Sequence, residues 1–113
     1  MVYVIFAMKK LAQKGLTHKA RGIIRKAYAL DKKEDKNFNP KGKLSIEQME
    51  ISNAFIKEIN DINSEKTIKN VYEFLQKRIK KDSDYTLQRL TEICKRKIEQ
   101  ISLRKQYLNI IKQ

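Results

Sequence analysis

The sequence has little of what turn-rich or disulfide-bonded domains need. Its 113 residues include three glycines, one proline, one cysteine and no tryptophan. So few turn-forming residues leave little scope for a β-sandwich, and we expect an all-α fold. The single cysteine excludes an intramolecular disulfide and fits a reducing compartment, so we expect a cytoplasmic protein.

Long hydrophobic runs are also missing. The most apolar stretch, residues 2–8, is seven residues long, whereas a membrane-spanning helix needs about 20. No positively charged segment precedes it, as a secretory signal would require. We therefore expect no membrane span. The β-branched and aromatic residues of this stretch fit a short strand as well as a first helix, and we favour the helix.

Residues with catalytic chemistry are equally sparse. His18 shows no partner geometry for catalysis, and Cys94 lies on the apolar side of its segment, where a thiol is usually inert. The carboxylates are dispersed, and no set of side chains has the spacing of a metal site. We expect no enzymatic activity, no cofactor and no metal centre.

One segment resembles the start of an EF-hand calcium loop, from Asp61 onward. With Asp61 at the first loop position, the sixth is Lys66, where the sharp turn needs glycine. The twelfth is Tyr72, where calcium needs a bidentate glutamate. We expect a capped connection between two helices here, without a calcium site.

Acidic residues are absent from the first thirty positions. These positions carry seven lysines and arginines, in a chain of net charge +13. That asymmetry points to an anionic partner. Between Leu44 and Ser64 the balance reverses, with four acids against one lysine. This segment is either a solvated face or a surface that docks on a basic neighbour.

The spacing of the apolar residues predicts one helical domain, residues 1–113. We expect a compact bundle of four or five helices with a long C-terminal helix. The helices are expected over residues 2–14, from Thr17 to about residue 33, from Ser45, from Asn63 or Ser64, and from residues 82–84 to about residue 112. A flexible loop is expected at residues 31–43, where asparagine, proline and glycine cluster.

Two helices carry informative apolar patterns. The helix from Ser45 has Gln48 in the capping-box position, and its apolar residues are Ile46, Met49, Ile56, Ile59 and Ile62. The last helix has heptad-like apolar positions interrupted by Lys97 and Arg104, which favours a long bundle helix over a coiled coil. If its last third overhangs the bundle, its apolar residues need a partner, and homodimerisation there is an alternative.

The stretch from Leu11 to Lys26 resembles a helix-turn-helix unit. Gly15 supplies the small residue of the turn, Leu16 anchors it, and Thr17 caps the second helix. Arg21 occupies a position that usually holds an apolar anchor. Gly22 weakens the helix interior unless it marks a close helix contact. The basic face of this helix fits a groove-binding unit, a phosphate contact without base readout, or a solvated surface.

We expect the protein to be a small nucleic-acid-binding protein, accessory or regulatory, that contacts phosphates through this helix. The basic ends of the fourth and fifth helices extend the surface if folding brings them alongside. The sequence leaves open whether the polymer is DNA or RNA. The candidate residues are Lys14, Lys19, Arg21, Arg25, Lys26, Lys77, Arg78, Lys80, Lys81, Lys95 and Arg96.

A protein-interaction module is the alternative function. An adaptor, inhibitor or effector would use the basic surface, or the apolar end of the last helix, to bind an acidic or helical protein. The two alternatives differ in surface layout: one continuous basic face favours nucleic acid, and an exposed apolar surface rimmed by charge favours a protein.

Overall fold

The computed structural model describes residues 9–13, 15–33, 45–80 and 84–112. The long helices are α2 (His18–Lys33), α3 (Ile46–Asn60), α4 (Glu65–Arg78) and α5 (Tyr85–Lys112), and residues 9–13 are also helical. The predicted all-α bundle with a long C-terminal helix is confirmed. The choice between helix and strand at residues 2–8 lies outside the described residues.

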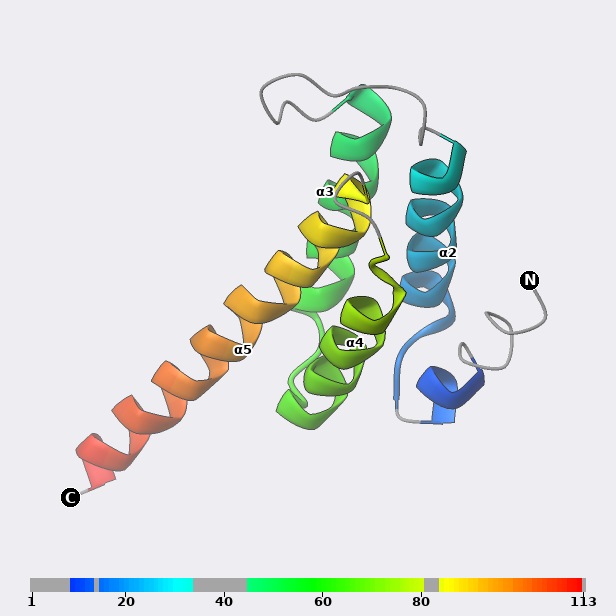
Figure 1. The fold of residues 1–113 in the computed structure, drawn as a ribbon. Coiled ribbons are helices and arrows are strands. Elements are labelled where there is room, and N and C mark those ends of the chain that lie inside the picture. The colour runs from blue at the N-terminus through cyan, green and yellow to red at the C-terminus, as the bar shows by residue number, and fades with distance from the viewer. Residues whose placement is uncertain (1–8, 14, 34–44, 81–83, 113) are drawn as a thin grey trace.

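The first half of α5 is the centre of the bundle. It contacts α2, α3 and α4, and α2 also contacts α3. Figure 1 shows the second half of α5 projecting away from the other helices. The buried apolar residues form one cluster, drawn from all four helices and from the segment before α2: Leu11, Leu16, Ala20, Ile24, Ala27, Phe55, Ile59, Ile68, Val71, Leu75, Leu87, Leu90, Ile93 and Cys94.

The turn before α2 forms as predicted. Leu16 N–H donates to the Leu11 carbonyl (3.0 Å) and Gly15 N–H to the Ala12 carbonyl (3.2 Å), the hydrogen-bond pair of a Schellman motif. Gly15 has a φ of 96°, which favours glycine because it has no Cβ. The Thr17 hydroxyl then accepts from Ala20 N–H (3.2 Å) and caps α2. The turn at Gly15 and the cap at Thr17 are therefore present as expected.

The start of α3 is the predicted capping box. Ser45 and Gln48 exchange side-chain to backbone hydrogen bonds. The buried face of α3, however, differs from the prediction. Ile46 and Met49 are 76% and 50% exposed, and Gln48 is buried instead. Gln48 Nε2 donates to the hydroxyl of Thr86 on α5 (3.1 Å). This hydrogen bond turns Gln48 toward the core, whereas the apolar periodicity predicted that Ile46 and Met49 would face it.

The end of α2 corrects the predicted loop. Asp31, Lys32 and Lys33 are helical, so residues 31–43 are not all loop, and residues 34–43 lie outside the described part. The Asp31 carboxylate is buried and accepts hydrogen bonds from Thr86 N–H (3.0 Å) and Leu87 N–H (2.8 Å). Amides in the first turn of a helix have no partner within that helix. Asp31 therefore caps α5 from another helix, which no local pattern predicts.

The α4 helix begins after Ser64, whose hydroxyl accepts from Thr67 N–H (3.2 Å). This confirms the capped connection expected after Asp61. Glu65, in the first turn, pairs with Lys105 of α5 (2.7 Å) and Lys69 (3.2 Å). These lysines, Lys105 above all, lower the pKa of the Glu65 carboxyl. The ion pair with Lys105 ties α5 to α4 at the point where α5 leaves the bundle.

Gly22 does not mark a close helix contact, contrary to one reading of the sequence. A Cβ atom built there would meet no heavy atom within 4 Å. Gly22→Ala is therefore expected to stabilise the protein by about 1 kcal/mol, because alanine costs less backbone entropy in a helix. Urea unfolding measures this difference. The reverse change on the same helix, Ala29→Gly, is expected to destabilise by a similar amount, and a destabilised Gly22→Ala would contradict the open packing.

None of the helices in the described ranges has the length and apolar character needed to cross a bilayer.

Candidate functional site

One row of α2 side chains is basic. Arg21, Arg25 and Lys32, with Tyr28, are spaced four, three and four residues apart, which places them on one face of the helix. Arg25 and Lys32 are exposed, and Arg21 is half-buried. The Arg21 guanidinium donates through Nε to the Thr17 carbonyl (3.3 Å), which holds its charge near the N-terminus of α2.

The end of α4 extends this row. A shallow cleft of about 160 Å³ brings Tyr28 and Lys32 of α2 together with Arg78 and Lys80. The Arg78 guanidinium lies over the Phe74 ring, 4.9 Å from its centroid, a cation–π contact that holds it in place. We name the set Arg21, Arg25, Lys32, Arg78 and Lys80 the basic stripe.

The acids at this cleft are withdrawn from solvent. Asp31 and Asp84 line it, but they are only 3% and 7% exposed. Asp31 caps α5, and Asp84 Oδ2 accepts from Lys80 N–H (2.9 Å). Burial raises the pKa of the Asp31 carboxyl, against the opposing effect of its hydrogen bonds to Thr86 and Leu87. Among the described residues that line the cleft, the exposed charge is therefore positive.

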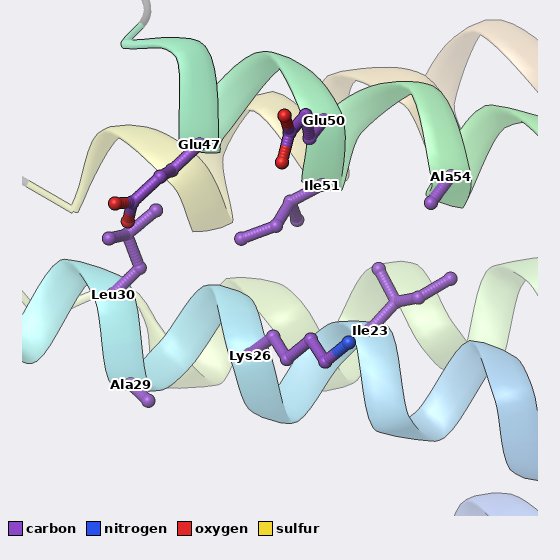
Figure 2. Close-up of a pocket in the computed structure, with 8 residues that line it drawn as sticks. All are labelled: Ile23, Lys26, Ala29, Leu30, Glu47, Glu50, Ile51 and Ala54. Atoms are coloured by element: carbon purple, nitrogen blue, oxygen red, sulfur yellow. The ribbon is translucent and has the colours of Figure 1, made fainter.

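The other predicted residues of α2 lie on a different flank. Lys26 lines a groove between α2 and α3 together with Ile23 and Leu30 (Figure 2), and Lys19 is seven residues before Lys26, in the same row. Lys19, Arg21, Arg25 and Lys26 were expected on the face opposite the apolar residues of α2, and none of them is buried. Their helical spacing divides them into two rows, of which only Arg21 and Arg25 belong to the basic stripe.

The remaining candidates stand apart from the stripe. Lys77 is exposed in the last turn of α4 and does not line the cleft. Lys95 and Arg96 are exposed on α5 next to buried Cys94, so they point away from the core. Arg96 pairs with Glu92 (2.6 Å), which offsets its charge. Lys14 and Lys81 lie outside the described residues.

Sequence reasoning missed Lys32. It was not named as a candidate, although its spacing of eleven from Arg21 and seven from Arg25 continues their row. That spacing was the signal that could have found it. Its proximity to Arg78 and Lys80 depends on how α2 and α4 approach each other, which the sequence does not contain.

The groups with catalytic chemistry are not assembled at the stripe. Burial raises the pKa of the Cys94 thiol to about 12, so the thiol stays protonated near neutral pH. In the part of the chain that the structure describes, His, Cys, Asp and Glu form no group of three or more suited to a metal ion.

No protein-family model, curated protein or solved structure matches this chain.

Proposed function

We propose that the protein binds nucleic acid through the basic stripe. The observation that carries the proposal is the alignment of Arg21, Arg25 and Lys32 on one face of α2, continued by Arg78 and Lys80 across a cleft whose two described acids are buried. Lysine and arginine contacts to phosphates supply most of the sequence-independent affinity for nucleic acid. Phosphate contact without base readout is the proposed mode.

The size of the stripe sets the expected strength of salt dependence. Its part on α2 spans eleven residues, about 16 Å along the helix axis, which is comparable to the axial rise of about five nucleotides of one strand. Five phosphate contacts give a slope of about −4.5 in a plot of log K against log salt for duplex DNA. That slope corresponds to a loss of about 500-fold in affinity between about 50 and about 200 mM salt.

Fluorescence anisotropy with labelled duplex DNA, single-stranded DNA and RNA at these two salt concentrations tests the proposal. Binding that persists in the micromolar range at the higher salt supports it, and a preferred polymer identifies the ligand. Binding seen only at low salt and equal for all polymers, or none at all, would contradict it, because a solvated basic surface behaves in that way.

A protein-interaction module remains the second candidate. The observation that favours it is the exposed apolar end of α5, where Leu103, Tyr107, Leu108, Ile110 and Ile111 are each at least 47% exposed. Exposed apolar patches of this kind commonly mark protein interfaces. This surface is separate from the basic stripe, so the two functions are compatible.

A further inference from the structure

The end of α5 is an apolar surface with basic flanks and without acids. Figure 1 shows this part of the helix outside the bundle, and we name residues 103–112 the overhang. Its large apolar side chains, Leu103, Tyr107, Leu108, Ile110 and Ile111, are between 47% and 68% exposed. Arg104, Lys105 and Lys112 are its charged residues, and the last acid in the sequence is Glu99.

A second unexplained surface is the groove between α2 and α3. It has a volume of about 430 Å³, and Ile23, Leu30, Ile51 and Ala54 are among the residues that line it. Figure 2 shows Glu47 and Glu50 on the α3 side of this groove, with Lys26 on the α2 side. Both glutamates are exposed. In a chain of net charge +13, this is an apolar groove whose described lining residues include two acids and one base.

The overhang of a molecule does not fill its own groove. Near the base of the overhang, Lys105 is bound to Glu65 of α4 (2.7 Å), and the helix continues outward from the bundle. The groove lies between two other helices, α2 and α3. Two overhangs from different copies are also poor partners for each other, because each carries the basic residues Arg104 and Lys112 and no acid, and like charges repel.

We propose that the overhang of one copy docks in the α2–α3 groove of a second copy. The charges are complementary: Glu47 and Glu50 of the groove face a helix whose charged residues are all basic. The lengths also agree. Leu103 to Ile111 spans about 12 Å of helix, and the groove runs seven residues along each helix, about 10 Å. Docking would cover two apolar surfaces that the single copy leaves in water.

This contact joins two different surfaces, so it is heterologous. Such contacts close into a ring when the geometry allows and otherwise form open chains. The basic stripe lies on the other flank of α2 from Lys26 and stays accessible in the assembly. The proposal therefore stands independently of nucleic-acid binding, and nuclease-treated protein tests it alone.

A charge-swap experiment tests the proposal by sedimentation velocity over a range of protein concentrations. The wild-type protein is expected to associate. A groove variant, Glu47→Lys with Glu50→Lys, and an overhang variant, Arg104→Glu with Lys112→Glu, are each expected to weaken self-association at least about tenfold. Each variant then has like charges on both surfaces. An equimolar mixture restores opposite charges at every contact and is expected to recover association.

Matched controls distinguish docking of the overhang in the groove from a general effect of net charge on self-association. The exposed acids Glu73 and Glu99 lie outside both surfaces, and reversing them to lysine is expected to leave association unchanged. Tyr107→Ser removes an apolar group from the overhang without changing the charge and is expected to weaken association. A wild-type protein that remains monomeric at all concentrations would overturn the proposal. So would variants that associate as the wild type does, or a mixture that does not recover.

Discussion

Reversing the charge of Arg21, Arg25 and Lys32 to glutamate is expected to weaken nucleic-acid binding by about a thousandfold at physiological salt. Each substitution removes one phosphate contact and adds a repulsive carboxylate in its place. The side chains of Arg25 and Lys32 are exposed, and Arg21 is half-buried, so the fold should be retained. Fluorescence anisotropy measures the affinity, and circular dichroism checks the helix content.

A control with the same change in net charge makes this result specific. Lys10, Lys57 and Lys66 are exposed and lie outside the stripe. Their joint reversal to glutamate lowers the net charge equally, but it leaves the stripe intact. We expect this control to lose far less affinity than the stripe variant. Equal losses in the two variants would show that total charge, and not the stripe, determines binding.

Asp31→Ala is expected to destabilise the protein by about 3 kcal/mol. The substitution leaves the amides of Thr86 and Leu87 buried without their acceptor, and each buried unsatisfied group costs about 1–3 kcal/mol. It also removes a negative charge from the positive end of the α5 dipole. For a domain of this size the loss lowers the Tm by about 10–15 °C. Thermal unfolding followed by circular dichroism measures the shift.

Two companion variants bracket the effect of Asp31→Ala. Asp31→Asn keeps one acceptor but places an amide donor against a backbone donor, so an intermediate loss is expected. Asp61→Ala removes an exposed carboxylate at the end of α3 and is expected to change stability by less than about 0.5 kcal/mol. A wild-type Tm for Asp31→Ala would mean that Asp31 lies in a loop and does not cap α5.

The pH dependence of the Asp31 effect has a definite sign. Burial raises the pKa of this carboxyl in the folded protein, so the folded state binds the proton more tightly than the unfolded chain does. The contribution of Asp31 to the free energy of unfolding is fully present below the pKa that its carboxyl has in the unfolded chain. It is lost as the pH rises through the pKa of this carboxyl in the folded protein. The difference in unfolding free energy between the wild type and Asp31→Ala should therefore be larger near about pH 4 than at pH 7.

The sequence predicts local structure well where the signal is local. Ser45 with Gln48, Ser64, and the Gly15 turn define helix ends through neighbours within five residues, and each forms as expected. The 28-residue α5 is likewise predicted, because its helical character is continuous from Tyr85 to Lys112.

The sequence does not predict the role of a polar residue when its hydrogen-bond partner is distant along the chain. The capping role of Asp31 is not predicted, because its partners, Thr86 and Leu87, are more than fifty residues away. Gln48 is predicted only as part of the capping box, whereas its amide also donates to the Thr86 hydroxyl in the interior. In both cases a hydrogen bond between two helices keeps a polar residue buried. The spacing of apolar residues along the sequence does not reveal such a bond.

The candidate site is predicted only in part for a similar reason. Arg21 and Arg25 were named as part of the basic side of the second helix, and Arg78 and Lys80 from the charge at the end of the fourth. Their common surface depends on the packing of α2, α4 and α5 around the buried Asp31 and Asp84. Lys95 and Arg96 were named on charge alone, and they lie on the outward face of α5.

The slope of log K against log salt for the wild type and for Arg25→Gln with Lys32→Gln tests most directly whether the stripe contacts phosphates. Neutralising two contacts is expected to reduce the magnitude of the slope for duplex DNA by about 2. The matched pair Lys57→Gln with Lys66→Gln is expected to leave it unchanged. An unchanged slope in the Arg25 and Lys32 variant would contradict the account, because these side chains would then release no counterions on binding.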